Sequence, residues 1–292
     1  MDLPESLKKF RREHDFFIGI DSDGCVFDSM EVKQKEFFIP LALKYFGLWP
    51  VSGILRKTWE YVNLYSVHRG GNRFISLVKV FDLLNRNKKV RDAGVDLPDM
   101  ESLRKWIDKE NRLGNENLRK YFESHPDAGL EKILLWSEAV NDEISRWLRN
   151  IPPFPNARRA IEKISSLADI VVVSQTPLGA IEREWKENSL EQFVKAIAGQ
   201  EHGTKTEHIA LAAKGKYADA RILMIGDAIG DYDAARNNGV LFYPVIPGKE
   251  DASWEKFYYE GFEKFINGTF AGDYANSLLE EFRRSLPENP PD

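Results

Sequence analysis

Three short apolar runs, each ending abruptly at a polar residue, are the feature that most limits what this chain can fold into. The runs and the residues that end them are FFIGI at 16–20 before Asp21, IVVV at 170–173 before Ser174, and ILMI at 222–225 before Gly226 and Asp227. Near-continuous runs of this length are typical of strands buried on both faces, as in parallel sheets. Weaker runs at 194–198 and 240–245 predict two further strands.

Helical patterns separate the later runs, for example at 157–167 and 206–214. Strands that alternate with helices predict right-handed crossover connections between parallel neighbours. The expected fold class is therefore α/β, with a doubly wound, Rossmann-like parallel sheet.

A different pattern fills the stretch between the first and second strong runs, where strand-like segments are scarce. Trp136, Val140, Ile144 and Trp147 recur at helical spacing, and residues 36–46 and 100–122 also predict helix, although Pro40 interrupts the former. We expect a helical insertion here.

The domain boundaries follow from this insertion. We predict a discontinuous α/β core formed by residues 1–30 and 152–292, and an inserted helical cap formed by residues 31–151. The insertion ends in a proline-rich segment at 151–155 that disfavours helix and predicts a semi-rigid linker. Asn156 is expected to cap the helix that follows.

Composition excludes several classes of protein. Among 292 residues, 42% are hydrophobic and 30% charged, which is enough apolar mass for a globular core. The net charge of -5 argues against a general nucleic-acid binder, which would be basic over a whole face. No stretch approaches the roughly 20 apolar residues of a membrane helix, and the charged N-terminal residues lack a secretory signal pattern. The single cysteine, Cys25, cannot form an internal disulfide, so we expect a cytoplasmic protein.

The polar residues after the strong runs should meet in space. Ligands of open α/β sheets bind outside the carboxyl ends of the strands. The residues expected there are Asp21, Asp23, Ser174, Gln175, Thr176, Asp227 and Asp231. Several carboxylates at one place repel each other unless a cation holds them, and oxygen-only ligands favour Mg²⁺. A bound Mg²⁺ would also let an acidic site attract phosphate.

The sharpest local motif is the DxDG sequence from Asp21 to Gly24. Gly24 permits a tight turn directly after the strand. Taken alone, the motif is equally compatible with an acidic strand-to-helix turn that has no catalytic role. An EF-hand loop is excluded, because its sixth position requires glycine and is Val26 here.

With these motifs in order, the chain resembles the haloacid dehalogenase (HAD) superfamily, in its phosphatase branch with a helical cap after the first motif. The four motifs are matched by Asp21 to Gly24, by Ser174 after its apolar run, by Lys205, and by the GDxxxD sequence from Gly226 to Asp231. The resemblance covers about 15–29 and 154–248. Cys25 stands where the family usually has threonine. We interpret it as a small packed residue, with a redox or nucleophilic role as the alternative.

The resemblance implies a role for each carboxylate. Asp21 would be the nucleophile that forms an aspartyl-phosphate, and Asp23 the general acid and base. Mg²⁺ would be held by the Asp21 carboxylate, the Asp23 carbonyl and Asp227, with Asp231 supporting the ion through water or by orienting its neighbours.

The resemblance also implies the phosphate contacts. Ser174 and the backbone N–H of Gln175 would bind phosphoryl oxygens, and Lys205 would offset their charge. Lys214 and Lys216 compete with Lys205 for this role. The spacing favours Lys205, because it leaves room for a helix and a strand before Asp227.

Two segments outside the motifs have open interpretations. The HRGGNR sequence at 68–73 combines two glycines with Arg69 and Arg73, which could clamp a carboxylate or second phosphate of the substrate, or form an ordinary basic surface loop. Near the C-terminus, Trp254, Phe257, Tyr258, Phe262 and Phe265 recur at helical spacing. They predict either a helix packed on the sheet, which we favour, or an aromatic surface for a partner.

The function expected from these features is Mg²⁺-dependent hydrolysis of a phosphomonoester in a small phosphorylated metabolite. A phosphomutase of the beta-phosphoglucomutase type is the alternative, because it uses the same aspartyl-phosphate. The acid at Asp23 disfavours a phosphonatase or dehalogenase. A non-catalytic phosphate-binding module would be expected to lack Asp21 or Asp23, and both are present. The substrate, the oligomeric state and the role of the C-terminal segment stay open.

Overall fold

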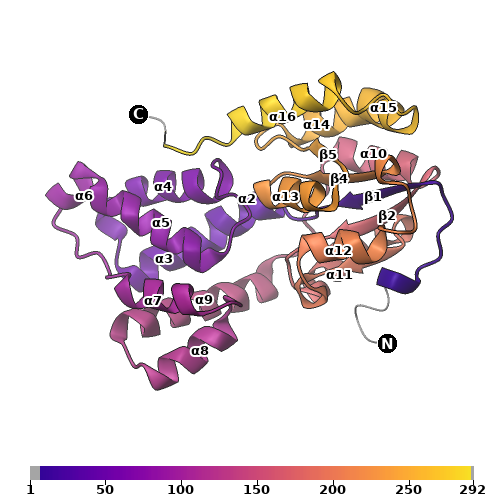
Figure 1. Cartoon of the computed structure of the whole chain (residues 1–292). Helices are drawn as coiled ribbons and strands as arrows, with labels where there is room; N and C mark the ends of the chain where they lie inside the picture. The colour runs from indigo at the N-terminus through magenta and orange to yellow at the C-terminus, as the bar shows by residue number, and fades with distance from the viewer. Residues whose placement is uncertain (1–6, 291–292) are drawn as a thin grey trace. The chain divides into compact units, whose positions relative to one another are not determined.

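The computed structural model describes residues 7–290 and contains one parallel sheet (Figure 1). Its strand order is β3-β2-β1-β4-β5, and the bounds are β1 Phe16–Ile20, β2 Ala168–Val173, β3 Ala196–Ala198, β4 Ile222–Gly226 and β5 Leu241–Pro244. Each strand coincides with a run predicted to form one, although β2 begins two residues earlier, at Ala168, and β4 ends one residue later, at Gly226. The predicted α/β class with a doubly wound sheet is therefore confirmed.

The order of the strands places a switch point beside β1. The chain first builds outward through β2 and β3, and then returns to add β4 and β5 on the other side. Ile20, the last residue of β1, pairs with Val172 of β2 and with Ile225 of β4. Since crevices for ligands form where the strand order reverses, the carboxyl end of β1 is the expected site.

Helices cover both faces of this sheet. Their bounds are α10 Pro155–Ile164, α11 Leu178–Glu187, α12 Lys205–Ala212, α13 Ile229–Asn238, α14 Glu250–Lys256, a π-helix at Phe257–Gly261, α15 Phe262–Ile266 and α16 Asp273–Ser285. Alternate strand residues face opposite sides: Ile18 and Ile20 join the core shared with α10, α11 and α14, whereas Phe17 joins the core shared with α12 and α13.

The C-terminal aromatic residues pack inside the molecule. Trp254, Phe257 and Phe262 are fully buried in the same cluster as Ile18 and Ile20. The packed-helix interpretation is therefore confirmed.

The helix after the proline-rich segment begins differently from the prediction. Its N-cap is Phe154, with Pro155 at the first helical position. Asn156 lies inside the first turn, where its backbone N–H and its side-chain amide both donate to Asp251 at 2.8 Å. The prediction that Asn156 caps the helix is wrong, because Pro155 already starts it.

The chain forms two compact units. Within the described residues, one unit joins 7–30 with Arg149–Pro287, and the other joins Glu31–Leu148 with 288–290. The elements from Ser29 to Trp147 are α2 Ser29–Val32, a π-helix at Lys33–Phe38, α3 Ile39–Phe46, a 3-10 turn at Trp49–Val51, α4 Ser52–Leu64, α5 Arg73–Arg86, α6 Lys88–Asp92, α7 Glu101–Lys109, α8 Asn115–Ser124 and α9 Ala128–Trp147.

The second unit is helical and has its own core. Trp59, Trp136, Phe38 and Phe46 meet edge-on or tilted, with ring centroids 5.8–6.4 Å apart. Pro40 does not end the helix around it. Pro40 is the second residue of α3, directly after the π-helix. The first turn of a helix does not need the N–H that proline lacks, so Pro40 is tolerated at this position.

The predicted helix at 100–122 is divided in two. α7 ends at Lys109, and α8 begins after Gly114, which is extended at φ -158°. Among residues 7–290, no helix is both long and apolar enough to cross a bilayer.

Candidate active site

Three carboxylates meet at the switch point of the sheet. Asp21 follows β1, Asp227 follows the paired strand β4, and Asp231 lies in the first turn of α13. One oxygen atom of each lies within 4.8 Å of the others, and all three residues are buried. Residues more than 200 positions apart in the chain are thus delivered to one point by the pairing of two strands.

Lys205 is the cation of this cluster. It is the first residue of α12, and its Nζ lies 2.9 Å from Asp21 Oδ2 and 2.6 Å from Asp231 Oδ1. Burial alone would lower the pKa of Lys205, but Asp21 and Asp231 raise it well above its ordinary value. The side chain is therefore a permanent ammonium ion.

The two competing lysines are engaged elsewhere. Lys214 Nζ donates to Asp219 and to the carbonyl of Asn238, the latter at 2.9 Å. Lys216 Nζ donates to the carbonyl of Leu7 at 3.2 Å. Of the three candidates, the structure brings only Lys205 to the carboxylates.

Negative charge exceeds positive charge in this cluster, as far as the described residues show. Lys205 pairs with two of the three buried carboxylates, and burial together with Asp21 raises the pKa of Asp231 to about 6 against the lowering effect of Lys205. A divalent ion with oxygen ligands at about 2.1 Å would bring ligand atoms to roughly 3–4 Å of one another, close to the spacing here. The hard oxygen donors, their burial and the missing positive charge all fit such an ion.

The turn after Asp21 is held by its own backbone. The N–H groups of Cys25, Val26 and Phe27 all donate to the carbonyl of Ser22, at 2.9–3.3 Å. Gly24 has φ +82°, in the left-handed region that favours glycine. The motif glycine is therefore required by the turn.

Asp23 projects from this turn. It is partly exposed, whereas the other residues from Asp21 to Phe27 are buried. The Ser29 hydroxyl donates to Asp23 Oδ1 at 2.6 Å. This contact of Ser29 has no counterpart in the sequence motifs, because it depends on the chain folding back after the turn.

Ser174 lies at the same edge of the sheet. It follows β2, which pairs with β1, and it is buried. Its N–H donates to the carbonyl of Ala198 at 3.0 Å, and its Oγ accepts from the N–H of Thr176 at 3.2 Å. The Gln175 side chain turns to the loop before α12 and donates to the carbonyl of Gly203 at 2.8 Å.

Cys25 is a packed thiol. It is fully buried, and its Sγ lies 4.0 Å from the carbonyl of Ile225 as a weak donor. Burial, followed by the negative charges of Asp227, Asp21 and Asp231, raises its pKa well above the ordinary value. A reactive thiolate is disfavoured here, which supports the packing interpretation.

Arg69 and Arg73 lie inside the helical unit. Arg69 is 2% exposed and donates to the carbonyl of Leu64 at 2.9 Å. Arg73 begins α5, donates to the carbonyl and hydroxyl of Ser137 at 3.1 Å, and stacks 5.0 Å from the ring centre of Phe38. Burial lowers the pKa of Arg73 to about 10. The interpretation as an ordinary basic surface loop is wrong for Arg69, which is buried, whereas Arg73 is partly exposed. A role of either side chain in substrate binding stays a prediction.

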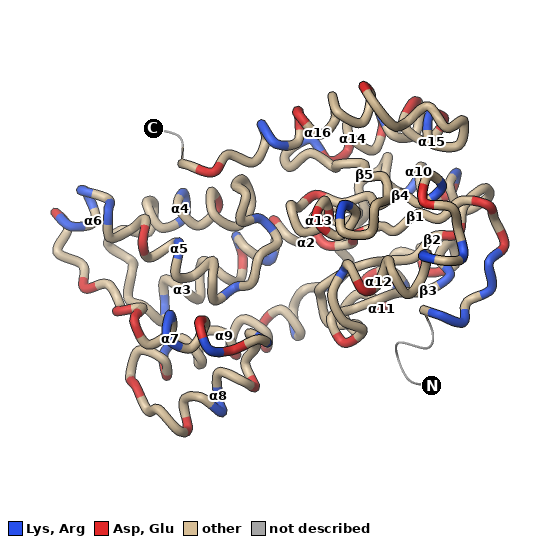
Figure 2. The backbone as a smooth tube through the Cα atoms, viewed as in Figure 1, with Lys and Arg blue, Asp and Glu red and all other residues tan. Residues whose placement is uncertain are grey.

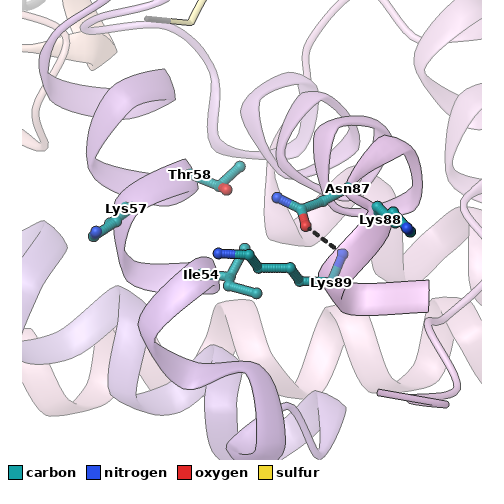
Figure 3. Close-up of a pocket in the computed structure, with 6 residues that line it drawn as sticks. All are labelled: Ile54, Lys57, Thr58, Asn87, Lys88 and Lys89. Atoms are coloured by element: carbon teal, nitrogen blue, oxygen red, sulfur yellow. Dashed lines mark hydrogen bonds between the residues drawn. The ribbon is translucent and has the colours of Figure 1, made fainter. Parts of the chain in front are cut away.

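A separate hollow of about 530 Å³ opens in the helical unit and has the opposite charge (Figure 3). It is lined by Ile54, Lys57, Thr58, Asn87, Lys88 and Lys89, and basic residues are frequent around α6 in the backbone view of Figure 2. The Lys89 N–H donates to Asn87 Oδ1 at 3.0 Å. No carboxylate lines this hollow, so it lacks the ligands of a cation site.

Comparisons with known proteins agree with this architecture. Residues 86–245, more than half of the chain, match the family model described as Haloacid dehalogenase-like hydrolase. No curated protein sequence matches the chain.

Three of the solved structures that are similar to this chain illustrate how low the sequence identity to them is. A haloacid dehalogenase-like hydrolase from Streptococcus pneumoniae is 14% identical, with 86% of this chain and 97% of that chain covered and a TM-score of 0.46. A candidate beta-phosphoglucomutase from Bacteroides vulgatus is 15% identical, with 91% and 97% covered and a TM-score of 0.49. A predicted phosphoglycolate phosphatase from Haemophilus somnus is 14% identical, with 80% and 86% covered and a TM-score of 0.45.

Proposed function

This chain belongs to the haloacid dehalogenase-like hydrolase family and is a hydrolase, and we propose that it is a Mg²⁺-dependent phosphomonoesterase of a small phosphorylated metabolite. One observation carries the proposal: three buried carboxylates meet beside the turn that presents Asp23, and Lys205 pairs with two of them. Such a cluster needs further positive charge, and a phosphate ester can approach it only when that charge is present.

Under this proposal, Mg²⁺ would be held by the carboxylates of Asp21 and Asp227 and the carbonyl of Asp23, with Asp231 in support. When bound, the ion supplies positive charge that offsets the carboxylates and the phosphoryl oxygens. Asp231 already accepts from Lys205 and from the N–H of Ala228, at 2.6 and 3.1 Å. Its contribution is therefore to orient Lys205 and the start of α13 rather than to bind the ion alone.

The residues of the turn carry the chemistry in two displacements. The Asp21 carboxylate attacks phosphorus and forms an aspartyl-phosphate, while the bond from phosphorus to the leaving oxygen breaks. Asp23 donates its proton to that oxygen, and its carboxylate later takes a proton from the water that attacks the aspartyl-phosphate. Ser174 Oγ, the Gln175 N–H and Lys205 Nζ bind the phosphoryl oxygens and offset their developing charge.

We further propose that residues 31–151 act as a cap that selects the substrate, with Arg69 and Arg73 binding a second anionic group. Because Arg69 is buried and Arg73 is partly buried against Phe38, replacing them also removes packing. Arg69→Lys and Arg73→Lys keep the charge and are the better test. The expected result is a KM several-fold higher at unchanged melting temperature, and an unchanged KM in both variants would contradict this role.

Turnover of p-nitrophenyl phosphate with and without Mg²⁺ tests the reaction itself. The wild-type protein should require the ion, and Asp21→Asn should lower kcat by on the order of 10⁴-fold while keeping its fold. Turnover that is unaffected by Asp21→Asn would remove the proposed nucleophile.

A panel of metabolite phosphates with phosphate release as readout would then identify the substrate class. Hexose phosphates in the panel separate a hydrolase from a phosphomutase, because a mutase returns an isomeric hexose phosphate and releases little phosphate. We also propose a cytoplasmic location, since the one cysteine is buried and forms no disulfide.

A further inference from the structure

Two tryptophans reach the turn from Asp21 to Phe27 from different parts of the α/β unit. Each donates its indole N–H to a residue of that turn, and each is fully buried. Neither tryptophan belongs to the four motifs of the family resemblance, and the chemistry proposed above uses neither.

Trp185 comes from α11, the helix that follows Ser174. Its Nε1–H donates to Ser22 Oγ at 2.9 Å. The Ser22 hydroxyl in turn donates a hydrogen bond to Glu184 Oε2, at 3.4 Å. The Trp185 ring also packs edge-on against Phe27, with ring centroids 5.9 Å apart, so it touches both ends of the turn.

Trp254 comes from α14, in the C-terminal segment. Its Nε1–H donates to the carbonyl of Cys25 at 2.7 Å. α14 itself is fixed to β5, because the Tyr243 hydroxyl donates to the Ser253 carbonyl at 2.7 Å. The segment after β5 is therefore joined to the turn by the Trp254 indole.

These two contacts bracket Asp23. Ser22 precedes it and Cys25 follows two positions later, so each side of Asp23 is tied to a rigid helix by a buried hydrogen bond. The Ser29 hydroxyl orients the carboxyl group itself, at 2.6 Å from Oδ1. A partly exposed side chain on an otherwise buried turn is thereby limited to a small range of positions.

We propose that Trp185 and Trp254 are positioning residues, which hold Asp23 where its proton can reach the leaving oxygen. This inference rests on the proposed phosphomonoesterase function, and it gives the C-terminal segment a role in that reaction. As the Asp21–phosphorus bond forms, the bond to the leaving oxygen breaks. Its electron pair stays on that oxygen, which takes the Asp23 proton. A displaced Asp23 slows this step most when the leaving group is strongly basic.

The effect is therefore measured with two esters of similar shape. Phenyl phosphate has a more basic leaving group than p-nitrophenyl phosphate and depends more on the acid. The comparison uses kcat/KM at saturating Mg²⁺, which reports only the steps up to the first irreversible one. Trp185→Phe and Trp254→Phe each remove the N–H and keep a buried aromatic ring.

Losing one buried hydrogen bond should lower kcat/KM for phenyl phosphate by about fivefold to tenfold. The loss for p-nitrophenyl phosphate should be clearly smaller. The matched control is Trp106→Phe, in the helical unit. Trp106 is also buried, and its Nε1 has no hydrogen-bond partner within residues 7–290, so both rates should keep their wild-type ratio.

The inference would be overturned if both Trp185→Phe and Trp254→Phe kept the wild-type ratio of kcat/KM for phenyl phosphate to kcat/KM for p-nitrophenyl phosphate, whatever their melting temperatures. An equal loss for both esters keeps that ratio and is the result of a general loss of structure. If one variant does not fold, the other makes the same test. Wild-type protein that hydrolyses neither ester contradicts the proposed function itself.

Discussion

Two buried carboxylate sites lie at opposite ends of the same sheet and are supplied with hydrogen-bond donors very differently. Asp169 stands at the beginning of β2, paired in register with Phe17. Its oxygens accept from the Tyr217 hydroxyl at 2.7 Å, from the N–H groups of Glu13 and His14 at 2.9 and 3.1 Å, and lie 3.1 Å from His14 Nδ1. Asp169 is thus one charge with several donors.

The opposite end has more charges for its donors. Asp21, Asp227 and Asp231 are three charges, of which Lys205 bridges two. The N–H groups of Ser22 and Ala228 also donate to Asp21 and Asp231, at 2.8 and 3.1 Å. Burial raises the pKa of both Asp169 and Asp231, yet the hydrogen bonds from Tyr217, His14 and Glu13 bring the net pKa of Asp169 below its ordinary value. Asp231 stays raised, at about 6. A saturated buried carboxylate stabilises the fold, whereas an undersupplied cluster is suited to bind a cation.

The largest expected difference between the two sites is in activity. Asp227→Asn should lower kcat/KM for p-nitrophenyl phosphate by on the order of 10²–10³-fold, because a ligand of the proposed ion is lost. Asp169→Asn should leave the rate per folded molecule unchanged. Steady-state kinetics normalised to folded protein decides, and an equal loss in both variants would erase the distinction.

The free energy of unfolding should depend strongly on Asp169, the residue whose substitution is expected to leave activity unchanged. Asp169→Ala leaves the Tyr217 hydroxyl and two backbone N–H groups without their acceptor, and should lower the free energy of unfolding by about 3 kcal/mol. Tyr217→Phe removes only one of these bonds and should cost about 1 kcal/mol. Denaturation by urea measures both. A loss below that of Tyr217→Phe would show that Asp169 is not a stabilising site.

Mg²⁺ should stabilise one end of the sheet only. At a concentration 100 times Kd, the ion should add about 2.7 kcal/mol to the free energy of unfolding, seen as a higher melting temperature. The gain should disappear in Asp227→Asn and persist in Tyr217→Phe. This measurement needs no turnover, so it tests the cation site apart from the reaction.

A further expected effect is a pH dependence of stability without divalent ions. Because the pKa of Asp231 is raised in the folded state, the folded protein holds a proton that the unfolded chain has lost between pH 3.8 and about 6. Stability should therefore fall as pH rises through that window, by about 1–3 kcal/mol.

Asp169 does not contribute in that window. Its pKa is lowered, so its stabilisation is complete above its ordinary value of 3.8 and is lost only as pH falls further. Urea unfolding at pH 4, 5 and 6 in a chelator should show the slope in the wild-type protein and lose it in Asp231→Asn. An identical slope in both would assign it to another group.

Much of the reactive end could be predicted from the sequence because its parts are local. A strand buried on both faces needs a continuous apolar run, and a tight turn at positive φ needs Gly24, so both can be recognised from neighbouring residues. The role of Asp169 cannot be recognised in this way. It is a single acid inside an apolar run, and its donors come from Glu13, His14 and Tyr217, which are distant in the chain.

The sequence by itself determined the strands, the acidic residues that follow them and the helical insertion, since each can be recognised from a pattern of a few neighbouring residues. Only the tertiary structure decided that Lys205 bridges Asp21 and Asp231, that Arg69 is buried, and that Trp185 and Trp254 donate hydrogen bonds to the turn. Those contacts join residues far apart in the chain. Their partners are set by how helices pack on the sheet, and no local pattern encodes that packing.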